Sequence, residues 1–142
     1  MNQFHPQGIL VDVTKRDRLI VPSTKSFSGP PAPPTPPFID HFECYKVKLT
    51  PGQPKLGHIL VSTVTDQIGT FSLELTRPIR LCAPVNKNNE SPGAETHPDH
   101  LFCYKTKAVG LNLNPFLADQ FGTRQWELIH RREFCVPSLK NP

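Results

Sequence analysis

Three short motifs occur twice along this 142-residue chain, in the same order, and this duplication constrains the fold more than any other feature. The pairs are HFECYKVK at 41–48 with HLFCYKTK at 100–107, DQIGT at 66–70 with DQFGT at 119–123, and LCAP at 81–84 with FCVP at 134–137. The Asp of the second motif precedes the Cys of the third by 16 positions in both copies. Self-similarity of this kind indicates a tandem repeat, so we expect two copies of one structural unit.

A third, partial copy precedes these two. NQF at residues 2–4 is similar to DQF at 119–121, and VPSTK at 21–25 is similar to VPSLK at 136–140. The partial copy contains only the second half of the unit, and Ile20 stands where the cysteine is expected. The first half, which carries the other cysteine, is missing as well. Loss of both cysteines together is what disulfide pairing within one repeat predicts.

A proline-rich segment separates the partial copy from the full ones. Residues 28–37 contain six prolines, whose fixed φ and missing N–H exclude helices and central strands. We expect an extended polyproline II spacer of roughly 30 Å, and such a segment can also bind aromatic grooves of partner proteins. The sequence therefore predicts an N-terminal half repeat at 1–27, a linker at 28–37, and repeats at 38–96 and 97–142 that form one compact unit.

Apolar and polar residues alternate at matching places in the three copies. Apolar side chains flank an acidic residue in each case, at Leu73 and Leu75, at Trp126 and Leu128, and at Val11 and Val13. A period of two is typical of a half-buried strand. We therefore expect the acidic residues to point outward and the apolar ones, Trp126 included, to point into the core.

Turn signals and proline content complete the fold prediction. Residues 59–64 read as a strand, and Asp66 with Gly69 supplies turn chemistry between it and the strand that starts at Phe71, which predicts a hairpin. The prolines that follow Cys82 and Cys135 should end a strand or confine it to a sheet edge. With 17 prolines and no capped amphipathic helix, the chain is predicted to be all-β. We expect short antiparallel strands, about three in each full repeat, in a small sandwich or barrel-like fold.

The four cysteines permit three disulfide connectivities. The repeat favours Cys44 with Cys82 and Cys103 with Cys135. Each bridge would close a loop of more than 30 residues and contribute about 4 kcal/mol in the chain-entropy model. Units of about 50 residues have thin cores and need such help. Disulfides would also imply an oxidising compartment.

Two alternative chemistries use the same cysteines. His41 with Cys44 and His100 with Cys103 have metal-ligand spacing, and the remaining two cysteines could complete zinc sites. Residues three apart on a strand point to opposite faces, however, which favours disulfides over a metal site. A Cys103–His100 nucleophile is disfavoured because four cysteines at equivalent positions are typical of a framework.

Composition excludes other classes of function. The net charge of +4 is spread over the chain, with six Lys or Arg against five Asp or Glu in residues 41–96 and six against four in 97–142. A nucleic-acid binder would show a clustered basic footprint, so we expect no nucleic-acid partner. No apolar run approaches the roughly 20 residues of a membrane span. Phosphate-binding loops and nucleophile elbows are absent from the sequence, and no cofactor is expected.

Together, the motifs HxxCYK, DQFG and LCxP resemble an uncharacterised bacterial repeat family, a domain of unknown function in proteins that are mostly predicted to be exported. The resemblance covers residues 41–88 and 100–141, plus the half copy at 2–25. It implies an extracellular or periplasmic module without an assigned activity, and it transfers no catalytic residue. The chain begins in the middle of a repeat without a visible export signal, so we expect a fragment, a misplaced start or a processed product.

The leading functional hypothesis is a non-enzymatic, exported β-repeat module for interaction or surface display, held by two disulfides. Its partner would be an unknown protein or a cell-surface glycan. An alternative is a carbohydrate- or cell-wall-binding module in which exposed Tyr45, Tyr104 or Trp126 stacks on sugar rings. A third hypothesis is an enzyme that depends on zinc or on a reactive cysteine. The half repeat should leave free strand edges, so self-association through β edges is also expected.

Overall fold

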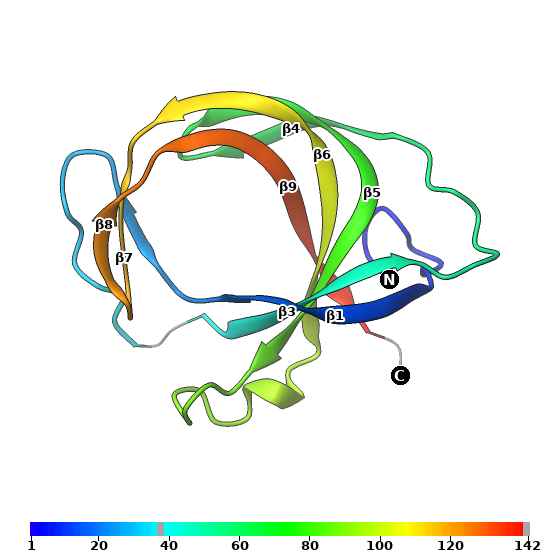
Figure 1. Ribbon diagram of the computed structural model, residues 1–142, viewed down its shortest axis with the longest axis horizontal. Helices are drawn as coiled ribbons and strands as arrows, with labels where there is room; N and C mark the ends of the chain where they lie inside the picture. The colour runs from blue at the N-terminus through cyan, green and yellow to red at the C-terminus, as the bar shows by residue number, and fades with distance from the viewer. Residues whose placement is uncertain (37–38, 141–142) are drawn as a thin grey trace.

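The computed structural model describes residues 1–36 and 39–140, and almost all of its regular structure is β-strand, which confirms the all-β prediction (Figure 1). A six-stranded antiparallel sheet has the order β1-β3-β5-β6-β9, with β4 paired to β5, and a three-stranded sheet has the order β2-β7-β8. The strands are β1 (Val11–Ile20), β2 (Thr24–Ser26), β3 (His41–Leu49), β4 (Ile59–Asp66), β5 (Gly69–Val85), β6 (Asp99–Leu113), β7 (Phe116–Asp119), β8 (Gly122–Gln125) and β9 (Leu128–Leu139), with one short 3₁₀ helix at Ala94–Thr96. Within the described ranges no helix is long and apolar enough to cross a membrane.

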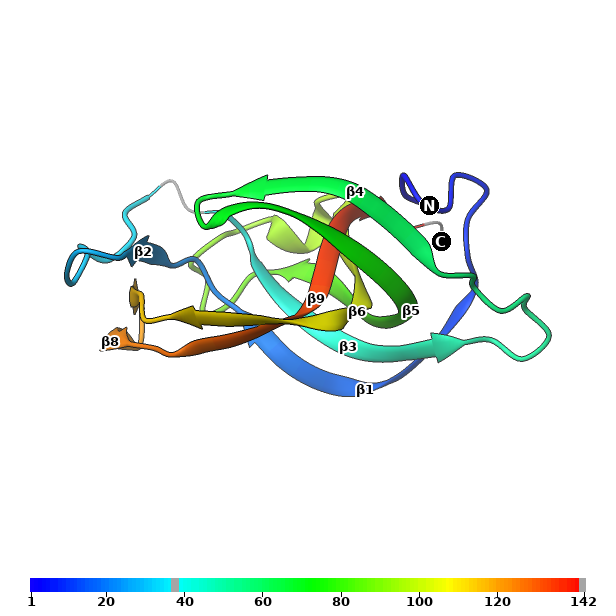
Figure 2. The same ribbon diagram turned by 90° about the horizontal axis from the view of Figure 1, so that it is seen from above.

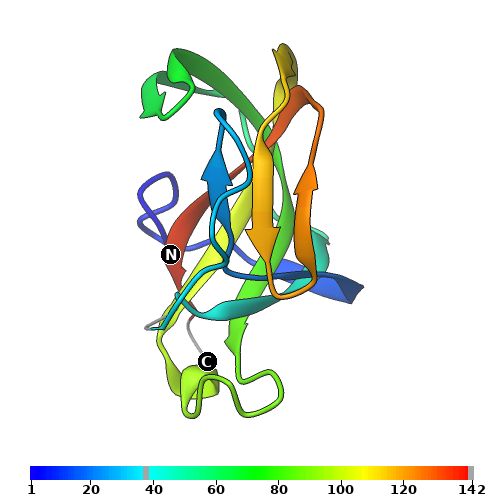
Figure 3. The same cartoon turned by 90° about the vertical axis from the view of Figure 1, so that its left-hand side faces the viewer.

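The large sheet is strongly curved. In Figure 1, β4, β5, β6 and β9 arch over the top of the molecule while β1 and β3 run beneath them. Seen from above, β1 and β3 bend around the long strands rather than lying flat against them (Figure 2). The small sheet stands at one end, where β2, β7 and β8 lie side by side (Figure 3). Long, bulged strands such as β5 make this curvature possible, because each β-bulge bends and twists its strand.

Three turns at matching sequence positions share one geometry. Asp66 Oδ1 accepts hydrogen bonds from backbone N–H groups two and three residues later, at 2.7 and 3.1 Å, and closes the β4–β5 hairpin. Asn2 Oδ1 makes the same pair of bonds at 3.0 and 3.1 Å, and Asp119 Oδ1 makes the first of them at 2.7 Å in the β7–β8 hairpin. Gly69 and Gly122 then adopt φ of 152° and 125°, which favours glycine. The predicted Asp-Gly hairpin is confirmed.

The main core lies between β3, β5, β6 and β9. Its buried members are Val47, Leu73, Leu75, Phe102, Tyr104 and Val136. The inward phase predicted for Leu73 and Leu75 is confirmed, because they are 3% and 1% exposed. The prediction for Trp126 is wrong, since it is 51% exposed. Trp126 lies in the connection after β8 ends, where its backbone N–H donates to the Pro115 carbonyl at 2.9 Å, so the strand's alternation does not extend to it.

The N-terminal segment is part of the same body as the rest of the chain. β1 pairs with β3 from Val11 to Ile20, and β2 pairs with β7, so strands on both sides of the proline-rich segment belong to common sheets. The Thr24 hydroxyl donates to the Ala32 carbonyl and fixes this segment against β2. The segment therefore connects two strands of one structure instead of spacing an independent unit; residue 37, its predicted last residue, lies outside the described ranges.

The prolines after the cysteines lie where their strands are paired on one side only. β5 continues past Pro84 to Val85, but its pairing with β6 ends at Cys82, opposite Leu101. Pro137 lies in β9, the outermost strand on that side of the sheet. At both sites the proline has no strand partner on one side, so its missing N–H leaves no sheet hydrogen bond unmade there. This is the edge placement that the sequence predicted.

Candidate functional site

Two disulfides lie side by side in the large sheet. Cys44 is bonded to Cys82 across β3 and β5, and Cys103 to Cys135 across β6 and β9. These are the pairs that the repeat favoured, and in each pair the two residues are direct cross-strand partners. Cys44, Cys82 and Cys103 are fully buried and pack as one cluster with Cys135. The bridges therefore join four neighbouring strands at a single place.

The zinc site and the cysteine nucleophile that the sequence left open both need free thiols. All four cysteines are consumed by the bridges, so the metal set of His41, Cys44, His100 and Cys103 and the Cys103–His100 nucleophile do not form. His41 and His100 have other partners. His41 Nε2 lies 3.5 Å from a Glu90 carboxylate oxygen, and His100 Nδ1 lies 2.9 Å from the Pro98 carbonyl.

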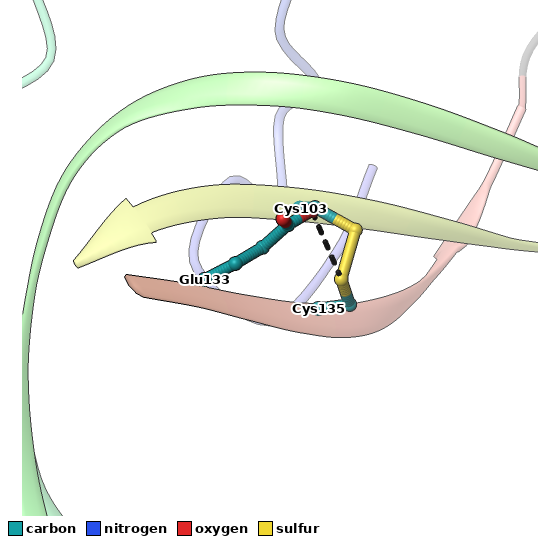
Figure 4. Close-up of side chains that lie close together, drawn as sticks. All are labelled: Cys103, Glu133 and Cys135. Carbon is teal, nitrogen blue, oxygen red and sulfur yellow. Dashed lines mark hydrogen bonds between the residues drawn. A yellow bond between two sulfur atoms is a disulfide. The ribbon is translucent and has the colours of Figure 1, made fainter. Parts of the chain in front are cut away.

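A carboxylate adjoins the second disulfide. Glu133, Cys103 and Cys135 bring one oxygen and two sulfurs within 4.8 Å of one another, and within the described ranges they are the one His/Cys/Asp/Glu group with such spacing (Figure 4). The dashed line in Figure 4 joins Cys135 Sγ to Glu133 Oε1 at 3.8 Å. A disulfide sulfur carries no hydrogen to donate and no thiolate to bind a metal, so this is a packing contact.

An ion-pair network covers the disulfides on the same face of the sheet. Arg80 binds both Asp17 and Glu133, Arg18 Nη1 lies 3.5 Å from Glu133 Oε2, and Lys46 Nζ lies 3.5 Å from Asp17 Oδ1. The hydrogen bond from Arg80 lowers the pKa of the Asp17 carboxyl. The side chains of Arg80 and Asp17 are each 13% exposed, so screening by water is reduced.

The sequence contained an unused signal for this network. Arg18, Arg80 and Glu133 occupy the same place in the three copies, two residues before Ile20, Cys82 and Cys135 respectively. Because the copies pack next to each other in one sheet, these equivalent positions converge. Their opposite charges could have been read from the alignment of the copies, but their contact required the sheet order.

A small cavity lies at the start of β3. It has a volume of about 260 Å³ and is lined by three prolines together with three polar side chains: Pro22, Pro33, Pro34, His41, Glu90 and Gln120. These residues come from the β1–β2 junction, the proline-rich segment, β3, the loop after β5 and the β7–β8 turn. The cavity therefore exists only because the proline-rich segment folds back on the body of the protein.

Polar groups at this cavity are partly unsatisfied. His41 is 3% exposed, and its Nδ1 is buried without a hydrogen-bond partner in the described part of the chain. Glu90 is 35% exposed at its side chain, and the ammonium of Lys87, which is hydrogen-bonded to it, lowers the pKa of its carboxyl. A buried unpaired imidazole nitrogen next to an ionised carboxylate and apolar walls can hold a small uncharged group that donates hydrogen bonds.

The two tyrosines proposed as ligand contacts have different surroundings. Tyr104 is 1% exposed, and its hydroxyl group accepts a hydrogen bond from Asn2 Nδ2 at 3.0 Å. Burial raises the pKa of Tyr104 to about 12. The prediction that Tyr104 stacks on a ligand is therefore wrong, because its alternation in β6 turns it into the core. Tyr45 remains half-buried on β3.

The fold and the site define a class: an all-β module whose sheet is crossed by two buried disulfides and which has a small, proline-walled cavity at the start of β3. Comparison of the chain with family models, with curated proteins and with solved structures finds no match in any of the three.

Proposed function

We propose that this protein is a disulfide-stabilised, non-enzymatic module that acts outside the cytoplasm in interaction or surface display. The observation that carries the proposal is the pair of buried bridges, Cys44–Cys82 and Cys103–Cys135. Disulfides persist in oxidising compartments and are rare in the reducing cytosol of mesophiles. An extracellular or periplasmic location is compatible with this framework.

The distribution of perturbed carboxylates also supports a structural and binding role over catalysis. Asp17, Glu74 and Glu90 have lowered carboxyl pKa values because they accept hydrogen bonds from Arg80, Lys107 and Lys87 respectively. Groups held in their charged form by ion pairs are poor proton carriers near neutral pH. The His41 cavity is the place where we expect a small ligand group to bind.

The proposal is tested by the redox state of the protein as it is made. We expect the intact mass under non-reducing conditions to lie four hydrogens below the mass after reduction, two for each bridge. Peptide mapping should recover the 44–82 and 103–135 pairs. Four alkylatable thiols in the freshly isolated protein, or turnover of a substrate that a single polar substitution abolishes, would overturn the proposal.

Carbohydrate or cell-wall binding is a second candidate, and Trp126 is the residue that favours it. The indole is 51% exposed, and an accessible aromatic ring can stack on a sugar face. We expect Trp126→Ala to weaken binding to isolated cell-wall polysaccharide at least tenfold, as measured by pull-down. Phe121→Ala is the matched control, because Phe121 is also exposed, at 69%, on the β7–β8 turn. Equal binding by the wild type and both variants would remove this candidate.

A further inference from the structure

The outer edge of β9 differs from the corresponding edges of two related strands. β1, β5 and β9 occupy the same place in the three sequence copies, because they contain Ile20, Cys82 and Cys135 at the same motif position. On the side that faces the next copy along the chain, β1 pairs with β3 and β5 pairs with β6, and each of these partners carries the first cysteine of that next copy. In the described ranges, the backbone hydrogen bonds of β9 go to β6 and, at Leu139, to Met1.

The two occupied edges use one register. Arg18 of β1 lies opposite Cys44, and Arg80 of β5 lies opposite Cys103. Both arginines stand two residues before the motif position of the second cysteine. The residue of β9 in that place is Glu133, whose outward neighbour in the sheet is absent from the described chain. The same register thus specifies which residue of an added strand would lie opposite Glu133.

The backbone of β9 is oriented to accept such a strand. The Cα atoms of Cys103 and Cys135 are 4.0 Å apart, the short spacing of a pair that exchanges no backbone hydrogen bonds. The N–H and C=O groups of Cys135, and by alternation those of Glu133, therefore point away from β6 and toward the free edge. Cys82 has the same relation to Cys44, at 3.9 Å, and its backbone groups are used by β6.

A proline limits the available edge in the same way in all three strands. Pro22, Pro84 and Pro137 each stand two residues after the motif position of the second cysteine. Pairing with the next strand ends just before this proline, at Ile20 in β1 and at Cys82 in β5. The free edge of β9 should likewise accept a strand only up to Cys135, because Pro137 has no N–H to donate.

The opposite edge of the sheet lies close to this one. Arg18 extends from β1, the outermost strand on the other side, and its Nη1 reaches within 3.5 Å of Glu133 Oε2 on β9. Extended Arg and Glu side chains can span a gap one strand wide, about 10 Å from backbone to backbone. A strand seated on β9 would therefore also lie within reach of the Arg18 side chain.

From these observations we propose that β9 binds an extended segment of a partner polypeptide by antiparallel strand addition. The proposal deepens the interaction role given above and rests on it. The segment has the pattern of residues 41–46 and 100–105, with a small or apolar residue opposite Glu133 and an aromatic residue next to it. A second copy of this chain does not supply it, because β3 and β6 are already paired on both sides. Backbone hydrogen bonds would give affinity, and the alternating side chains would give selectivity.

The test uses the full chain with its disulfides intact and a synthetic peptide of residues 41–49 carrying Cys44→Ala. We expect saturable binding with a Kd of about 0.1 mM or tighter. Hydrogen exchange should show new protection of the amides of Glu133 and Cys135. In the register given above, peptide residues 44 and 42 face these two positions, so N-methylation at 42 and 44 should weaken binding at least tenfold. The same modification at 43 and 45 should leave it unchanged.

Variants of the protein test the same edge from the other side. Glu133→Pro removes an outward N–H, whereas the control Glu133→Gln keeps it and removes only the charge. We expect the first to lose peptide binding and the second to keep it; if Glu133→Pro does not fold, the N-methylated peptides decide. Absence of saturable binding, equal effects of the two N-methylation patterns, or protection at another edge would overturn the proposal. Such a result with both disulfides intact leaves the module itself standing, whereas free thiols would overturn the module.

Discussion

The two copies of the cysteine motif share their local structure but differ in how their second halves are placed. In the first copy the β4–β5 hairpin returns along the large sheet, and Ile59, Val61, Val64 and Phe71 pack against the core. In the second copy the β7–β8 hairpin leaves that sheet and pairs with β2. The disulfides, turns and strand register are thus properties of the motif, while the position of the hairpin depends on the segment that precedes it.

A turn in that segment accounts for the difference. β3 ends at Leu49, and the Gln53 N–H then donates to the Thr50 carbonyl at 3.1 Å around Pro51 and Gly52. Proline followed by a glycine with φ of 86° is typical of a type II turn, which ends the strand and starts the return. The second copy has no Pro-Gly pair there, and β6 continues to Leu113. Its hairpin is therefore displaced toward the far end of the molecule.

The largest expected effect comes from removing either disulfide. The Cys44→Ala/Cys82→Ala and Cys103→Ala/Cys135→Ala variants lose bridges with sequence separations of 38 and 32. Chain entropy predicts that each double variant loses about 4 kcal/mol of unfolding free energy, with nearly equal values for the two. Urea denaturation without reductant measures both. A much larger loss for the first variant would show that burial of its two sulfurs, and not loop closure, dominates.

Arg80 of β5 forms ion pairs with Asp17 of β1 and Glu133 of β9, and its replacement breaks both. Arg80→Met leaves Asp17 and Glu133 with only their more exposed partners, Lys46 and Arg18, and we expect a loss of about 2 kcal/mol at pH 7. The pKa of Asp17 is lowered in the folded state, so its contribution is present above its unfolded pKa and disappears as the pH falls through the folded value. The gap between wild type and variant should therefore narrow in acid. A gap that is constant from pH 7 to pH 2 would contradict this account.

Tyr45 and Tyr104 stand at equivalent positions of the two copies but differ in burial, so they provide a second comparison between the copies. Tyr104→Phe removes the hydroxyl group that binds Asn2, and we expect a loss of about 1 kcal/mol, whereas Tyr45→Phe should change little. The raised pKa of Tyr104, about 12, adds a pH signature. Stability should be complete below the unfolded pKa of about 10 and fall as the pH rises toward 12. Tyr104→Phe should abolish most of this alkaline decline, and equal declines in both variants would contradict the assignment.

Local sequence patterns were sufficient to predict the all-β fold class, the hairpin at Asp66 and the disulfide pairs. These features depend on residues that are close in the sequence or equivalent between copies. The inward phase of Trp126 was mistaken because a strand ended one residue earlier than the alternation suggested. The His41 cavity could not be predicted at all. Its walls come from five segments, and the proline-rich one was expected to extend away from the body. Such convergence depends on sheet order, which no local pattern of residues contains.

The smallest effect is expected at the two hairpin turns. Asp66→Ala removes an acceptor for two backbone N–H groups in a hairpin that packs on the core, and we expect a small loss of global stability. Asp119→Ala removes one such bond in a hairpin whose strand β8 is exposed along its length. Its cost should appear as faster hydrogen exchange in β7 and β8, with little change in global unfolding. Equal global losses in the two variants would show that the small sheet unfolds together with the large one. The two hairpins would then differ in position but not in stability.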